Sequence, residues 1–324
     1  MAVRALARVP GTWGELVQGA LDGVDFLITC PVDLWVDALA SAGRAGADLR
    51  GAGRTHAGWR APPGREKVAA VLASLPGRGR VRIWSPLRPG AGMGSSTADM
   101  AAALAAAAAA GGRPLDPLDV FRRCLAVEPT DGLMLPGIAL VDHRRGRRVE
   151  PLGPAPPLVI LGVDPGGAVP TRDFNRREDL DAANRRKEPL VREAHDLAVR
   201  AVAAGDPAAL AAAATLSARA HQAILPNPLW ERATALAREI RALGLNVAHS
   251  GVVLGFLLDP RHADAPAARA FLERRLGLPV RFLRLVPGGV RVASLGREFV
   301  GSIRASERRR PDAPSCPHLG PARR

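Results

Sequence analysis

The chain has 324 residues, 47% of them hydrophobic, and a formal net charge of +14, which predicts a globular protein large enough for two closely joined domains. Nearly all of the basic charge is arginine, and it is spread along an alanine-rich chain and not gathered in one patch. We therefore expect a positive electrostatic field that attracts small anions, but no nucleic-acid partner. The chain has no apolar run of about 18 residues, no signal-peptide pattern and only three widely spaced cysteines, so we expect no membrane association, no disulfide framework and a cytoplasmic location.

The first half of the chain alternates apolar segments with turn residues. In chain order we predict short strands between residues 3 and 37, a helix over 67–75, a strand over 81–84, a long alanine-rich helix from Thr97, a helix over 118–127 and a strand over 138–141. The segment 40–64 is rich in glycine, alanine and arginine, and it has neither a clear pattern nor a predicted role.

The second half begins after the proline-rich segment Gly153–Pro157, which marks a linker or a strand entrance. We predict a strand over 158–163, a mainly helical region to about residue 243, and then strand, strand, helix and strand over 247–250, 252–258, 263–276 and 280–286. Prolines 189, 207 and 228 are expected near helix starts, where a missing N–H is tolerated. This order is typical of an α+β protein whose second domain can form a ferredoxin-like layer.

A glycine loop opens the long helix, in the run Gly90-Ala-Gly-Met-Gly-Ser-Ser-Thr97. The glycines permit a tight turn that approaches an anion closely, and the helix start adds unpaired N–H groups at the positive end of the dipole. Ser95, Ser96 and Thr97 add hydroxyls where a phosphate or its Mg²⁺ would bind. The alternative is an ordinary turn in which one of these residues only caps a core helix. Neither a Walker loop nor a Gly-x-Gly-x-x-Gly pattern is present.

Two carboxylates follow in the turn Glu128-Pro-Thr-Asp131, between a predicted helix and a predicted strand. Pro129 and Gly132 force a turn there, so both acids can project into a cleft. In that position Asp131 can orient or deprotonate an alcohol, and Glu128 can bind Mg²⁺. Solvated acids at a capped turn are the alternative interpretation.

Two further loops carry polar residues next to apolar strands. Glu15 lies in the glycine-rich segment Pro10–Gly19, and Asp33 ends an apolar strand, so either acid can receive a substrate ammonium group or be an ordinary surface acid. His249 and Ser250 lie in a loop between two apolar strands, which either closes over phosphate or substrate or forms a simple hairpin.

Together and in this order, these segments resemble the GHMP kinase superfamily and, more narrowly, the bacterial L-threonine kinases of cobalamin side-chain synthesis. The four stretches that carry the resemblance are Gly14–Gly19 with Cys30–Asp33, Gly92–Asp99, Glu128–Asp131 and Ala248–Gly251. The proline of the family's loop motif is displaced, because Arg88 occupies its position and Pro89 follows, so we expect a slightly different loop entry. The resemblance covers most of residues 1–260.

The resemblance implies the GHMP kinase fold, with an N-terminal domain similar to ribosomal protein S5 domain 2 over 1–155 and a ferredoxin-like C-terminal domain over 156–305. The arginine- and proline-rich tail 306–324 is predicted to be disordered, with no assigned role. The implied reaction is transfer of the ATP γ-phosphoryl group to L-threonine, giving O-phospho-L-threonine for the aminopropanol linker of cobalamin. ATP and Mg²⁺ are the implied cofactors and L-threonine is the small-molecule partner, whereas no oligomeric state is implied.

The resemblance also implies roles for individual residues. It places Asp131 as the acceptor-orienting residue or base and Ser96 as a Mg²⁺ ligand, with Glu128 as a second ligand for which Asp99 competes. The implied substrate residues are Glu15, Asp33, His249 and Ser250. The phosphates of ATP are expected on Gly90, Ala91, Gly92, Met93, Gly94, Ser95, Ser96 and Thr97.

Two other functions are weighed against this one. The same fold can act on another small alcohol such as homoserine, which turnover of homoserine without turnover of L-threonine would indicate. A non-catalytic basic protein that binds a ligand or nucleic acid would instead show salt-dependent retention on DNA without ATP turnover.

Overall fold

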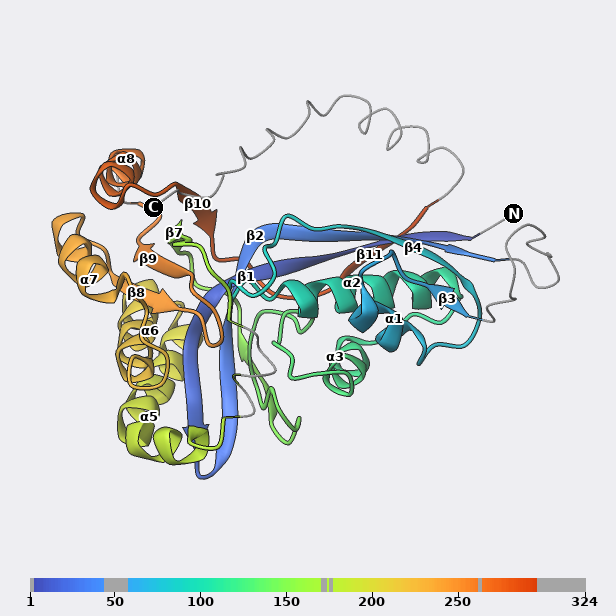
Figure 1. Ribbon diagram of the computed structural model, residues 1–324, viewed down its shortest axis with the longest axis horizontal. Coiled ribbons are helices and arrows are strands. Elements are labelled where there is room, and N and C mark those ends of the chain that lie inside the picture. Colours follow the sequence, from blue (N-terminus) through green and yellow to red (C-terminus); the bar gives the residue numbers. More distant parts are fainter. Residues whose placement is uncertain (1–2, 44–57, 170–173, 175–176, 262–263, 296–324) are drawn as a thin grey trace, which may run out of the picture.

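The computed structural model describes residues 3–43, 58–169, 174, 177–261 and 264–295. Most of the unpatterned segment 40–64 and the whole tail 306–324 lie outside the described residues, so the predictions about them are untested. The described part is a mixed α+β structure built on one 11-stranded sheet (Figure 1), which confirms the predicted fold class. No helix in this part is long and apolar enough to cross a membrane.

One long antiparallel hairpin runs through the molecule. It consists of β1 (Arg4–Leu21) and β2 (Val24–Ala42), which bend between their two halves (Figure 1). The prediction of short strands in this region was wrong, because the prolines and glycines that resemble strand breaks are absorbed as irregularities in the pairing. The register shifts between Pro10 and Gly11 and again on either side of Glu15. Such bulges bend a strand and redirect its side chains.

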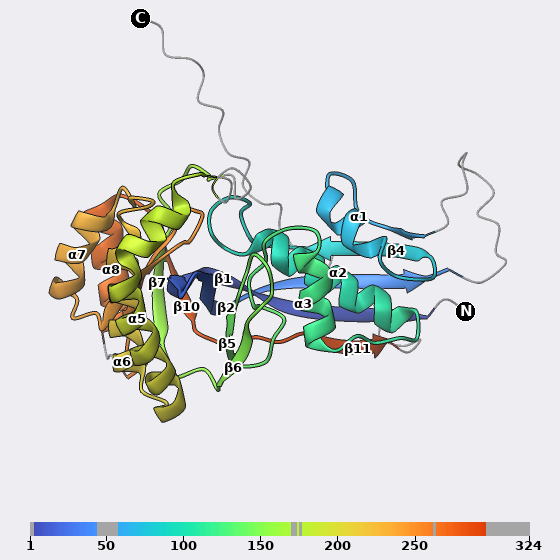
Figure 2. The same ribbon diagram turned by 90° about the horizontal axis from the view of Figure 1, so that it is seen from below.

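In the N-terminal part of the molecule three helices lie on one side of this hairpin (Figure 2). The helices are α1 (Glu66–Leu72), α2 (Ser95–Ala110) and α3 (Pro117–Leu125). Helix α2 packs directly against β1 and β2, and α1 and α3 pack against α2. The strands that extend the sheet here are β3 (Trp59–Arg60), β4 (Gly79–Trp84), β5 (Ile138–Val141) and β6 (Val149–Gly153). Nearly every residue of α2 is buried, and its alanines let the helix backbone approach β1 and β2 closely.

The C-terminal part has the strand and helix order of a ferredoxin-like layer. Its strands are β7 (Val159–Val163), β8 (Gly244–Val247), β9 (Leu254–Leu258) and β10 (Val280–Arg284), which pair antiparallel in the order β10-β7-β9-β8. Its helices are α5 (Leu180–Ala204), α6 (Pro207–His221), α7 (Trp230–Glu239) and α8 (Ala265–Leu276). Pro207 starts α6 as predicted, but Pro189 lies inside α5, where the helix continues through it.

The two parts share one sheet. Strand β8 pairs with β1 through Val247 and Glu15, so the bulged centre of the hairpin lies at the junction. A strand that the sequence did not indicate, β11 (Arg291–Leu295), returns from the C-terminal part and pairs with the start of β1. The proposed domain boundary between residues 155 and 156 therefore remains a prediction.

Candidate active site

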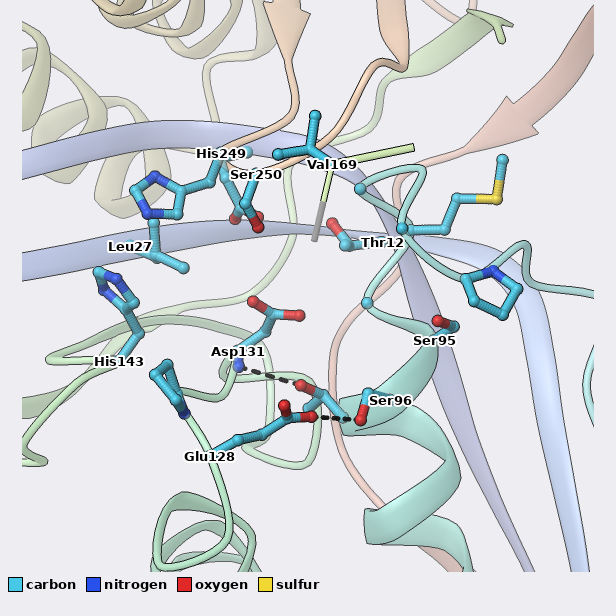
Figure 3. A pocket seen from close by; sticks show the side chains of 18 of the residues that line it. Thr12, Leu27, Ser95, Ser96, Glu128, Asp131, His143, Val169, His249 and Ser250 are labelled. Carbon is cyan, nitrogen blue, oxygen red and sulfur yellow. Dashed lines mark hydrogen bonds between the residues drawn. The ribbon is translucent and has the colours of Figure 1, made fainter. Parts of the chain in front are cut away.

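A cavity of about 230 Å³ lies at this junction (Figure 3). We call it the central cavity. It is bounded by the start of α2, the bulged part of β1, the turn 128–131 and the loop between β8 and β9. These are the four segments that carry the predicted site. The predicted site residues that line it are Glu15, Gly90, Gly92, Met93, Gly94, Ser95, Ser96, Thr97, Glu128, Asp131, His249 and Ser250.

Three predicted residues do not line the central cavity. The Asp33 carboxylate accepts a hydrogen bond of 2.9 Å from the backbone N–H of Arg284, on the strand β10. Ala91 points its carbonyl toward the chain around residues 252 and 253, whose N–H groups donate to it. Asp99 is buried and forms an ion pair with Arg65, so its carboxylate is already engaged.

The glycine loop is held in place through its carbonyl groups. The backbone N–H groups of Thr12 and Gly14 donate to the carbonyls of Met93 and Gly92, at 3.0 and 3.1 Å. Gly90, Gly92 and Gly94 have positive φ angles and alternate with residues of negative φ, as in the anion-binding turns called nests. A Cβ atom at Gly94 would come within 2.9 Å of a carboxylate oxygen of Asp131, so only glycine lets the two segments approach. The loop is therefore shaped to receive an anion beside an acid.

The start of α2 meets a carboxylate and a lysine at one wall of the cavity. The Ser96 hydroxyl donates a hydrogen bond to Glu128, and the Lys67 ammonium group lies 2.6 Å from the other oxygen of the same carboxylate. The Glu128 side chain is almost fully buried, whereas that of Lys67 is 38% exposed. Of the two acids considered for metal binding, Glu128 alone lines the cavity and contacts Ser96.

Asp131 and Glu15 place two carboxylates on the cavity floor, of which Glu15 is buried and Asp131 is partly buried. Burial and the nearby Glu128 raise the pKa of Asp131 to about 6, against a smaller opposing effect of the Thr97 hydroxyl. Burial and the charge of Asp131 raise the pKa of Glu15 well above its usual value. One oxygen of Glu15 has no hydrogen-bond partner among the described residues. A cation or a hydrogen-bond donor of a ligand would stabilise the charged form of Glu15 and would also give the unbonded oxygen a partner.

A buried network behind the cavity sets the state of His249. Its Nδ1 lies 2.9 Å from the Gln18 side-chain oxygen, and since that oxygen can only accept, Nδ1 carries the proton. Burial and the neighbouring histidines lower the pKa of His249, so its ring is neutral and Nε2 is an acceptor. His221 donates to the His249 carbonyl at 2.9 Å, and Lys187 lies 3.5 Å from the other ring nitrogen of His221. Burial lowers the pKa of Lys187 to about 8.

The donors present suit a nucleotide and Mg²⁺ better than a fully protein-bound metal. Among the described residues, no group of three or more His, Cys, Asp or Glu side chains is arranged to hold a metal ion. Mg²⁺ in proteins commonly takes one or two side-chain ligands and completes its shell with phosphate oxygens and water. Ser96 and Glu128, next to the glycine loop, provide that kind of partial site.

Several residues of the cavity were not predicted from the sequence. Thr12, Leu27, Lys67 and His143 line it, and Lys187 lies behind it. One signal pointed to the lysines, because Lys67 and Lys187 are the only lysines in a chain whose other basic side chains are arginine. Leu27 and His143 carried no local signal, since strand pairing and a turn far from the motifs bring them to the cavity.

Comparisons with known proteins identify the family of the chain. Residues 66–137 match the family model described as the GHMP kinases N terminal domain. The chain is 32% identical over 301 residues to the L-threonine kinase of Salmonella typhimurium, covering 89% of this chain and 95% of that protein. It is 31% identical over 296 residues to the L-threonine kinase of Citrobacter freundii, covering 88% and 99%. The crystal structure of a homoserine kinase from Cytophaga hutchinsonii has a TM-score of 0.64 at 15% identity, covering 90% of this chain and 97% of that chain, a likeness of fold alone.

Proposed function

Because the chain belongs to the GHMP kinases, we propose that it transfers the γ-phosphoryl group of ATP to the hydroxyl of L-threonine, yielding O-phospho-L-threonine and ADP. The observation that carries the proposal is the likeness to two L-threonine kinases along almost the whole chain. The meeting of all four motif segments at one cavity supports it. The resemblance of the sequence extends the proposal to the product, which would supply the aminopropanol linker of cobalamin.

The phosphates of ATP are assigned to the glycine loop and the start of α2. The loop offers alternating backbone conformations, and the first turn of α2 offers N–H groups at the positive end of the helix dipole. Lys67 adds a positive charge at the same wall. Phosphoryl transfer depends mainly on alignment and on neutralising charge, which these groups provide.

Mg²⁺ is assigned to Ser96 and Glu128, whose oxygens lie together beside the loop. Held there, the ion would neutralise part of the negative charge of the phosphates. Asp99 is left out of this assignment, because its carboxylate is buried against Arg65 outside the cavity.

The acceptor is assigned to the floor of the cavity. The Asp131 carboxylate takes the hydroxyl proton as the alcohol oxygen bonds to the γ-phosphorus and the bond to ADP breaks. A pKa of about 6 leaves Asp131 largely ionised at neutral pH and still basic enough to assist. The incompletely bonded carboxylate of Glu15 is suited to the ammonium group of the amino acid. His249 and Ser250 complete this end of the cavity, and Leu27 offers an apolar contact for the methyl group of L-threonine.

The proposal is tested by incubating the purified protein with ATP, Mg²⁺ and a panel of L-threonine, L-serine and L-homoserine. ADP release gives the rate, and ³¹P NMR identifies the phosphorylated product. We expect O-phospho-L-threonine and the highest kcat/KM with L-threonine. Strong turnover of homoserine without turnover of L-threonine would indicate a kinase that acts on another small alcohol. Salt-dependent DNA binding without any ATP turnover would indicate a non-catalytic basic binding protein.

A further inference from the structure

A second hollow, of about 250 Å³, lies between the turn that joins β1 to β2, the turn that joins β5 to β6, and the first turns of α5. We call it the arginine hollow, because Arg144, Arg145, Arg147 and Arg185 line it. Its lining is mainly charged and polar, so it suits a small ion or a polar metabolite. None of the motifs discussed above lies in it.

The carboxylate of Asp142, which also lines the hollow, is occupied by the backbone. It accepts hydrogen bonds from the N–H groups of Arg144, Arg145 and Arg147, at 3.1, 2.9 and 3.1 Å. This cap fixes the turn between β5 and β6. The carboxylate is therefore not available to pair with the guanidinium groups around it.

The other acids of the hollow are also paired. Asp25 lies 2.9 Å from the guanidinium of Arg144, and Asp181 lies 3.7 Å from the same group. Glu188 lies 2.7 Å from Arg192, one helical turn further along α5. Each acid of the hollow thus has a partner, and Arg144 is the only arginine of the four that the paired acids use.

The guanidinium groups of the other three arginines of the hollow are not used by these acids. Within the described part of the chain, the guanidinium groups of Arg145, Arg147 and Arg185 have no hydrogen-bond or ion-pair partner. We infer that the arginine hollow binds a small anion carrying a phosphate group. A guanidinium group binds phosphate oxygens through a pair of parallel hydrogen bonds. Three such groups carry more positive charge than one carboxylate can neutralise, which favours a phosphate group as the ligand.

The arginine hollow shares its walls with the central cavity. Asp142 and Arg144 line the hollow, whereas His143 between them lines the central cavity. On β2, Asp25 faces the hollow and Leu27 faces the central cavity. An anion that tightens these segments therefore acts on both sides at once, and we expect it to change the KM of the acceptor more than kcat. This coupling rests on the proposed function, whereas the binding itself does not.

Binding is measured by titration calorimetry with two probes, inorganic phosphate and O-phospho-L-threonine, on the full chain. A saturating non-hydrolysable ATP analogue with Mg²⁺ is present so that the glycine loop is filled. The test variant is R145A/R147A/R185A. The matched control is R200A/R219A/R238A, which removes the same charge at exposed positions away from both cavities.

We expect the test variant to bind phosphate at least tenfold more weakly than the wild type, and the control to bind like the wild type. Equal weakening in both variants would show that net charge, and not the arginine hollow, determines binding. Unchanged binding in the test variant would likewise overturn the site. A preference for O-phospho-L-threonine would identify product as the source of the phosphate, and a preference for inorganic phosphate would identify the free ion. An effect of phosphate on the KM of L-threonine that persists in the test variant would refute the coupling.

Discussion

The two hollows of this molecule hold their charges in opposite ways. In the central cavity, three buried or partly buried carboxylates face a single lysine, and two of them have a raised pKa. In the arginine hollow the carboxylates are bound by backbone N–H groups or arginines, and three guanidinium groups remain. The charge that the protein leaves without a partner indicates the sign of the ligand. The carboxylates of the central cavity are thus suited to a metal ion and an ammonium group, beside a glycine loop suited to phosphate. The arginine hollow is suited to an anion.

The strongest test of this contrast is D131N. We expect a loss of at least a hundredfold in kcat, because a carboxamide cannot accept the hydroxyl proton. Since the raised pKa means that the folded protein resists ionising Asp131, the variant should also unfold at a higher temperature at pH 8. Steady-state kinetics and thermal unfolding check both effects.

The matched control is D181N at the other hollow, where the Asp181 side chain is 73% exposed. We expect its kcat to stay within about twofold of the wild type, because it removes an acid that is outside the central cavity. Equal losses in both variants, or wild-type turnover in D131N, would contradict the assignment of Asp131.

A second test concerns the acid that is paired within the central cavity. S96A removes the hydroxyl that contacts Glu128, and we expect kcat/KM to fall at least tenfold, about 1.4 kcal/mol of transition-state stabilisation. The Mg²⁺ concentration for half-maximal rate should rise. The neighbouring S95A should cause a smaller loss, because no described side chain is bonded to that hydroxyl. A larger loss in S95A than in S96A would indicate that Ser95, and not Ser96, contacts the Mg²⁺.

The third test is E15Q, which keeps the shape of the side chain but removes its charge. We expect the KM of L-threonine to rise about tenfold with little change in the KM of ATP, since the lost contact is with the ammonium group. Because burial opposes the charged form of Glu15, the variant should be at least as stable as the wild type at pH 8. An unchanged KM for L-threonine would remove Glu15 from the acceptor site.

The smallest expected effect is the pH dependence of the wild type. With a pKa of about 6 for Asp131, kcat/KM should fall about fourfold between pH 7 and pH 5.5 as the carboxylate takes up a proton. The contribution of this group to stability has the opposite sign, because the unfolded chain loses the proton first. Stability should therefore fall as the pH rises from about 4 to about 6, and this fall should be smaller in D131N, where only the raised pKa of Glu15 still contributes.

Much of the site was predictable from the sequence, because phosphate binding and proton transfer need short contiguous segments. The glycine loop, the turn with Glu128 and Asp131, and the loop with His249 each carry their chemistry within a few residues, and all of them line one cavity. The order of strands and helices along the C-terminal part also followed from the sequence, because each element has its own hydrophobic pattern. The strand β11 lacked such a signal, since it forms only by pairing with β1.

Where the sequence offered two acids for the same role, only the tertiary structure shows which of them lines the cavity. Glu15 and Asp33 are both acids in the first two strands, yet a bulge in β1 directs Glu15 into the cavity, and the pairing of β2 leaves Asp33 beside Arg284. Asp99 and Glu128 differ in the same way, because Glu128 lines the central cavity whereas Asp99 is paired with Arg65 outside it. The sequence by itself determined which segments can hold phosphate, move a proton or build the sheet. Which side chains face the ligand depends on strand register and on ion pairs between distant segments, and those exist only once the chain is folded.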